Sequence, residues 1–113
     1  MTVRLPAFAF ALTCWTAAAG AFTGKCVLQV EGKTYLNGPC PIVLDKGGDF
    51  SIGVDEKTPS KFFAMVSLSD RPGVADGFWN GPDAEGHAHY PLGTLTRQGA
   101  CWVNGNTKVC AMK

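Results

Sequence analysis

The stretch CWVNGNTKVC, Cys101 to Cys110, places a hairpin turn midway between two cysteines. Gly105-Asn106 is a two-residue turn sequence in which the glycine, at the first position, supplies the positive φ that a type II′ turn requires. A turn centred there sets Cys101 opposite Cys110 on two antiparallel strands, at a separation that a disulfide can bridge. The stretch therefore predicts a β-hairpin closed by a disulfide.

The N-terminus has the features of a secretory signal peptide. Arg4 supplies a positive charge, Leu5 to Thr13 is a short apolar run, and Ala19-Gly20-Ala21 matches the small-residue site at which signal peptides are cleaved. We therefore expect residues 1–21 to be a signal peptide. Residues 22–113 are then the mature protein, which we expect to be secreted or periplasmic.

A cysteine directly after the apolar run allows a second interpretation, a lipoprotein signal in which Cys14 is acylated. Thr13 occupies a position where that signal has a smaller residue, so the first interpretation is favoured. The apolar run is also far shorter than the roughly 20 residues that a membrane-spanning helix needs, and no later run is longer. We expect no integral membrane segment.

Removal of Cys14 with the signal peptide leaves an even set of four cysteines, Cys26, Cys40, Cys101 and Cys110. An even number in a short exported chain indicates two disulfides. If the hairpin pairs Cys101 with Cys110, Cys26 pairs with Cys40 around a second hairpin-like segment. Zinc binding is the alternative, but the chain lacks the closely spaced Cys-x₂₋₄-Cys pairs with which one turn presents two thiolates to a metal.

Short apolar or alternating runs, separated by glycine and proline, make up the rest of the chain. Ile42–Leu44 and Phe50–Val54 flank a glycine-rich turn. Lys61–Ser69 is the most hydrophobic run, and Val74–Trp79 follows the turn sequence Asp70-Arg71-Pro72-Gly73. About eight or nine such strands, without a capped helical pattern, predict an all-β fold. We expect a small single-domain antiparallel sandwich or barrel stapled by two disulfides.

The charge balance argues against two classes of partner. The chain has ten basic and nine acidic side chains, and loss of Arg4 with the signal peptide leaves nine of each. A nucleic-acid-binding protein normally carries a basic excess that offsets the phosphates. The mature chain has neither that excess nor a basic amphipathic helix that would lie on an anionic membrane surface.

Both histidines, His87 and His89, lie in the stretch DAEGHAHYPLG. In an extended segment, side chains two positions apart point to the same side, so both imidazoles can reach one metal ion. This geometry supports an alternative hypothesis, a small metal-dependent hydrolase with a carboxylate ligand from Asp76, Asp83 or Glu85. His-x-His is an unspecific motif by itself, the chain has no third histidine, and the surrounding glycines offer little support for ligands. We therefore predict no metal and no cofactor.

Other catalytic arrangements receive less support. Cysteines that form disulfides have no thiolate to act as a nucleophile. The chain has no Gly-x-Ser-x-Gly nucleophile elbow and no glycine-rich phosphate loop. Acidic pairs such as Asp55-Glu56 lie in turn-like sequence, where solvated charge is the simpler interpretation. Binding is therefore favoured over catalysis.

The segment from Asp70 to Leu92 combines glycine and proline with Phe78, Trp79 and Tyr90. A loop of this length in a compact domain is often functional, and aromatic side chains offer a partner large contact area at low entropic cost. An equally compatible interpretation places Phe78 and Trp79 in a core strand. We expect the binding surface to consist of Phe78, Trp79, His87, His89 and Tyr90.

The run Phe78-Trp79-x-Gly81 ahead of Cys101 resembles a short stretch in one group of exported bacterial lysozyme inhibitors, which are also small disulfide-containing β domains. The resemblance implies inhibition of a host or envelope hydrolase such as lysozyme. The Ser-Gly-x-x-Tyr segment that enters the lysozyme cleft in that group is absent here, so the resemblance assigns no site residue.

Together, the signal peptide, the disulfides and the aromatic segment predict an exported binding module that recognises a protein or cell-envelope ligand without catalysis. The metal-dependent hydrolase remains one alternative. A secreted effector that acts on a host is the other, because it would have the same sequence features.

Overall fold

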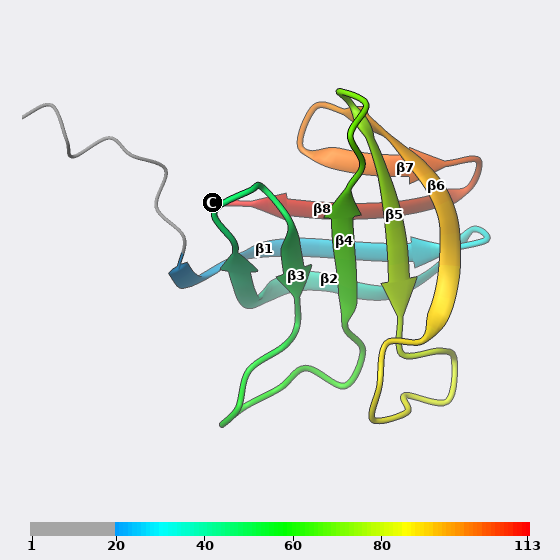
Figure 1. Ribbon diagram of the computed structural model, residues 1–113. Coiled ribbons are helices and arrows are strands. Elements are labelled where there is room, and N and C mark those ends of the chain that lie inside the picture. The colour runs from blue at the N-terminus through cyan, green and yellow to red at the C-terminus, as the bar shows by residue number, and fades with distance from the viewer. Residues whose placement is uncertain (1–19) are drawn as a thin grey trace, which may run out of the picture.

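The computed structural model describes residues 20–113, which form a closed antiparallel barrel of eight strands (Figure 1). Each strand pairs with the next one in the sequence, and β8 pairs back with β1. The predicted all-β fold is confirmed, and this last pairing makes it a barrel rather than a sandwich. The strands are β1 (Gly20–Val30), β2 (Lys33–Leu44), β3 (Phe50–Ile52), β4 (Ala64–Leu68), β5 (Val74–Trp79), β6 (Tyr90–Gln98), β7 (Cys101–Asn104) and β8 (Thr107–Met112).

Most of the expected signal peptide, residues 1–19, lies outside the described residues. Its last two residues, Gly20 and Ala21, begin β1 and pair with Leu44 and Val43 of β2. Within residues 20–113 we find no helix with the length and apolarity needed to span a bilayer.

The hairpin of β7 and β8 has the predicted register. Cys101 pairs with Cys110 and Asn104 with Thr107 around Gly105-Asn106. Gly105 has a φ of 60°, and Asn106 has no positive φ. A type II′ turn requires a positive φ at the first of its two central residues only, so both residues fit this turn. The disulfide between Cys101 and Cys110 joins Cα atoms 4.1 Å apart.

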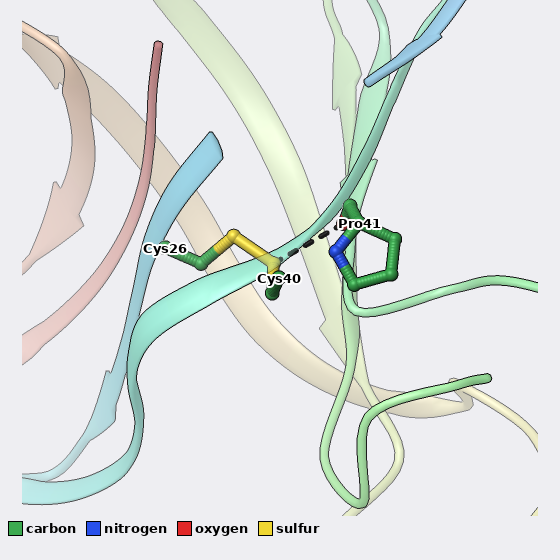
Figure 2. The surroundings of a disulfide bond; sticks show 3 residues. All are labelled: Cys26, Cys40 and Pro41. Atoms are coloured by element: carbon green, nitrogen blue, oxygen red, sulfur yellow. Dashed lines mark hydrogen bonds between the residues drawn. A yellow bond between two sulfur atoms is a disulfide. The ribbon is translucent and has the colours of Figure 1, made fainter. Parts of the chain in front are cut away.

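The second predicted disulfide, between Cys26 and Cys40, links β1 to β2 (Figure 2). These strands are joined by a two-residue turn in which Glu31 and Gly32 both have positive φ, as a type I′ turn requires. Cys26 pairs with Gly38 across the strands, so the two cysteines are diagonal neighbours, with Cα atoms 5.9 Å apart. Both are buried, and this disulfide is therefore part of the barrel interior.

Inward-pointing and outward-pointing side chains alternate along the strands, and the inward-pointing ones form the core. In β5, Ala75, Gly77 and Trp79 are buried, whereas Asp76 and Phe78 are exposed, because successive side chains of a strand point to opposite faces. The same alternation in the other strands fills the barrel. The buried core consists of Cys26, Leu28, Cys40, Ile42, Ile52, Ala64, Val66, Ala75, Trp79, Leu92, Leu95, Trp102 and Val109.

The segment from Asp70 to Leu92 is not one long loop. Its first part contains β5, as the strand pattern of Val74–Trp79 predicted, and Tyr90 begins β6. The loop is restricted to residues 80–89. The physical reason is that both flanking runs pair with neighbouring strands, which satisfies their backbone hydrogen bonds.

The two ends of the barrel differ in their loops. Because successive strands run in opposite directions, the loops at 53–63 and 80–89 lie at the same end, which we call the loop end (Figure 1). The shorter connections at 45–49, 69–73 and 99–100 lie at the other end, which we call the open end.

Candidate functional site

Asn80 joins the two loops of the loop end. It is fully buried, and its Nδ2 donates to the carbonyl oxygens of Lys61 and Glu85, each at 3.0 Å. Its Oδ1 accepts from the Phe63 N–H at 3.0 Å. The Asn80 N–H donates to the Phe63 carbonyl, and the Glu85 N–H donates to the Asn80 carbonyl. One side chain therefore holds both loops in a fixed arrangement, with its polar groups satisfied.

Glu85, Tyr90 and His89 form a polar cluster in loop 80–89 and at the start of β6. The Tyr90 hydroxyl donates to the Glu85 carboxylate, and Nε2 of His89 lies 3.3 Å from the same carboxylate. The rings of His89 and Tyr90 stack, with centroids 4.9 Å apart. Gly81 lies against the Tyr90 ring, and a Cβ there would come within 2.6 Å of it. The structure thus brings together two of the predicted residues, His89 and Tyr90.

Phe78 and Trp79 are adjacent in sequence but lie on opposite sides of the barrel wall. Trp79 is 5% exposed, and its ring centroid lies 4.6 Å from that of Tyr35. This burial agrees with the second interpretation, in which the strand carries an aromatic residue of the core, because the Trp79 ring is enclosed by the core. Phe78 points outward and is 38% exposed, so it remains a candidate for binding.

Phe78 belongs to an apolar strip on the outer wall. Its cross-strand neighbour on β4 is Met65, which is 42% exposed, and its neighbour on β6 is Pro91. Met65 and Phe78 are two of the large exposed hydrophobic side chains recorded in residues 20–113. We call Met65, Phe78 and Pro91 the outer apolar strip.

A depression of about 400 Å³ lies between the two loops, and Met65 of the strip is part of its lining. His87, another predicted residue, lines it, so the structure brings His87 to the same face as Phe78. Asp55 adds a carboxylate, whose pKa is lowered from its ordinary value by hydrogen bonds from the Thr58 hydroxyl and the Lys57 N–H. The loop depression is lined by Val54, Asp55, Pro59, Phe63, Met65, Gly86, His87 and Ala88.

The two histidines belong to different groups of side chains. His89 lies against Glu85 and Tyr90, whereas His87 lines the loop depression. In the part of the chain that the structure describes, no three side chains of His, Cys, Asp or Glu gather closely enough to hold a metal ion. Within residues 20–113, the two histidines of the metal-dependent hydrolase hypothesis therefore lie in separate groups of side chains.

The sequence analysis did not single out Met65, which is exposed, or Phe63, which is half-buried and lines the loop depression. The signal that could have identified Met65 is the alternation in KFFAMVSLS. Once Ala64 and Val66 are assigned to the interior, Met65 must point outward.

No protein-family model, no curated protein and no solved structure matches this chain. Two residues of the Phe78-Trp79-x-Gly81 run, which resembles lysozyme inhibitors, have structural roles in this barrel. Trp79 fills the core, and Gly81, with a φ of 82°, allows the Tyr90 ring to pack closely.

Tyr90 is expected to ionise at a higher pH than an ordinary tyrosine. Its hydrogen bond to Glu85 raises the pKa of the phenol above the ordinary value of 10.0, with burial and the Glu85 charge acting in the same direction. Because the folded-state pKa is the higher one, this contact stabilises the fold below about pH 10. Its contribution is lost as the pH rises through the raised pKa. Ultraviolet titration of the wild type, with Tyr90→Phe identifying the transition, measures this shift.

The matched variants are Glu85→Ala, which removes the acceptor, and Glu56→Ala, which removes an exposed acid of the neighbouring loop. Glu85→Ala should bring the Tyr90 transition down toward pH 10, whereas Glu56→Ala should leave it in place. An unchanged transition in Glu85→Ala would mean that the hydrogen bond does not control this phenol.

Proposed function

We propose that this chain is an exported binding module without catalytic activity that recognises a protein partner through its loop end. The observation that carries the proposal is the outer apolar strip, in which Met65 and Phe78 are 42% and 38% exposed side by side. The strip continues into the loop depression. Exposed apolar groups that form a patch beside polar surface are typical of protein-binding sites.

The surroundings of the strip fit this interpretation. The next outward pair on the same two strands is Ser67 with Asp76, both exposed and polar, so the apolar patch has a polar border. Phe78 lies on a strand that is paired on both sides, so little ordering is needed when it enters a partner's pocket. Met65 adds an unbranched, adaptable side chain of a kind enriched at binding surfaces.

Export is supported by the disulfides. Two bridges in a domain of this size are typical of oxidising compartments, in which disulfides form and persist. The signal-peptide features of residues 1–21 point to the same compartments. A secreted or periplasmic protein meets envelope and host proteins there, and we place the partner among these.

The test is a capture experiment with the disulfide-bonded protein on envelope and host-cell extracts. The strip variant carries Met65→Ser and Phe78→Ser. The matched control carries Ser67→Ala and Asp76→Ala on the neighbouring outward pair. A partner identified with the wild type should bind the strip variant at least about tenfold more weakly, since central apolar anchors dominate interfaces. The control should bind within about twofold of the wild type.

Two outcomes would count against the proposal. A partner that binds the strip variant as tightly as the wild type would place the interface elsewhere. A folded wild type that retains no specific protein would contradict the binding-module proposal itself. Inhibition of lysozyme by the purified protein is a direct additional assay, because it tests the one target that the sequence resemblance names.

A further inference from the structure

The barrel interior is accessible from the open end. A cavity of about 330 Å³ lies there, and most of its wall comes from strand positions that share the inward side of the alternation. Ile42 and Trp102 form its buried part, and Leu68 lies at its rim, 37% exposed. We call it the mouth cavity. Its apolar lining includes Phe22, Ile42, Leu44, Phe50, Leu68 and Trp102.

Hydrogen bonds fix the conformation of the rim of the mouth cavity. In the connection between β2 and β3, the Asp45 N–H donates to the Asp49 carbonyl at 2.8 Å, and the Gly48 N–H donates to the Asp45 carbonyl at 3.0 Å. The Asp49 carboxylate accepts from the Leu68 N–H at 2.8 Å, which ties this connection to β4. The cavity therefore exists before any ligand binds, as is usual for small-molecule sites.

A single guanidinium lies at the wall of this apolar space. The Cζ atom of Arg97 lies 5.8 Å from the centroid of the Trp102 ring, and its Nε donates to the Gly99 carbonyl at 3.1 Å. A guanidinium has five N–H donors, and within residues 20–113 the four on the terminal nitrogens of Arg97 make no hydrogen bond. Among residues 20–113, no carboxylate is recorded within ion-pair distance of Arg97.

We propose that the mouth cavity binds a small carboxylic acid with an apolar body. The apolar body would replace water against Trp102 and the aliphatic wall, and the carboxylate would accept two parallel hydrogen bonds from Arg97. A water molecule occupies about 30 Å³ of liquid, so the volume accommodates on the order of ten non-hydrogen atoms. Octanoate and phenylacetate both have this size, and they represent the two sources of such chemistry, fatty acids and aromatic acids.

This site is independent of the proposed protein interface. The mouth cavity lies at the open end, whereas the outer apolar strip and the loop depression lie toward the loop end. The strip variant with Met65→Ser and Phe78→Ser should therefore bind these acids as the wild type does. Failure of one proposal leaves the other unaffected.

The experiment is a calorimetric and NMR titration of the purified, disulfide-bonded protein with octanoate, phenylacetate, octanol and octylamine. Octanoate or phenylacetate should bind with saturation and shift the indole N–H signal of Trp102. The signal of Trp79, in the part of the core near the loop end, serves as an internal reference and should not move. Octylamine, a cation of similar length, should bind at least tenfold more weakly than octanoate.

Three variants make the result specific. Arg97→Gln should weaken octanoate binding at least tenfold and leave octanol binding within twofold, because only the carboxylate uses the guanidinium. Leu68→Trp fills the mouth and should weaken both ligands at least tenfold. Arg71→Gln, in an exposed turn of the same end but outside the cavity lining, is the matched charge control and should bind octanoate as the wild type does.

The proposal is overturned if neither acid shows saturable binding, or if Arg97→Gln binds octanoate as tightly as the wild type. Preservation of the strand signals in the NMR spectrum of each variant shows that the fold is intact. Should Arg97→Gln not fold, Arg97→Lys keeps the charge but loses the paired donors, and it should weaken octanoate binding relative to octanol by several-fold. Equal binding of octanoate by Arg97→Lys and the wild type would then overturn the proposal.

Discussion

Replacing Trp79 by alanine is expected to lower the free energy of unfolding by about 3–5 kcal/mol, the range for removal of a large aromatic side chain from a core. Trp79 is 5% exposed at the end of β5 and packs against Tyr35 and Phe62, with ring centroids 4.6 and 6.3 Å away. The alanine variant leaves a cavity among these rings that the closed barrel cannot fill by collapse. Urea denaturation followed by circular dichroism measures the change.

Phe78 provides the matched comparison, because it is the preceding residue and points to the other side of the wall. Phe78→Ala should cost less than about 1 kcal/mol, since an outer-wall side chain that is 38% exposed buries less apolar area and leaves no internal cavity. Similar losses of stability in Trp79→Ala and Phe78→Ala would show that the Phe78 side chain does not lie on the solvent-facing side of β5.

Replacing Asn80 by alanine is expected to destabilise the fold by about 3–5 kcal/mol, although the change removes only a short polar side chain. The variant leaves two carbonyls, of Lys61 and Glu85, and the Phe63 N–H without their partner. Each unsatisfied buried group costs about 1–3 kcal/mol. A loss of this size is a large fraction of the roughly 5–15 kcal/mol by which domains are stable. Urea denaturation measures it.

Two further variants identify the cause. Asn80→Asp keeps the shape and the acceptor but loses both donors, so it should also be strongly destabilising. Asn37→Ala, at an exposed position of β2, should change the stability by less than about 0.5 kcal/mol. In the Asn80 variants, hydrogen exchange should accelerate first at the Phe63 and Glu85 amides, because their loops are no longer held together. Wild-type exchange rates at these amides would contradict the role assigned to Asn80.

Most of the fold could be predicted from short stretches of the sequence. The Gly105-Asn106 turn set the register of β7 and β8, and that register set the pairing of Cys101 with Cys110. Val74–Trp79 was predicted as a strand with its observed bounds. These features were predictable because they rest on interactions between residues a few positions apart, whose turn chemistry and side-chain alternation are visible in one window.

The candidate site was predicted only in part. Phe78 and His87 were identified from the aromatic segment, and the structure brings them to the same face of the barrel. Trp79 was assigned to the same surface, because an aromatic pair does not reveal which member points inward. Met65 was missed, since its contact with Phe78 depends on the pairing of β4 with β5.

The sequence by itself predicted the all-β class, the strand Val74–Trp79, the Gly105-Asn106 turn and the two disulfides, because these depend on backbone conformations and on residues near each other in the chain. Only the tertiary structure decided that β8 closes on β1 to form a barrel. Closure fixes which side of every strand is enclosed, so it places Trp79 in the core and Phe78 on the wall. It also brings Arg97 and Trp102 to one cavity with Phe22, which lies at the far end of the chain. Such pairings over long sequence distances depend on the packing of the whole chain, which no single window contains.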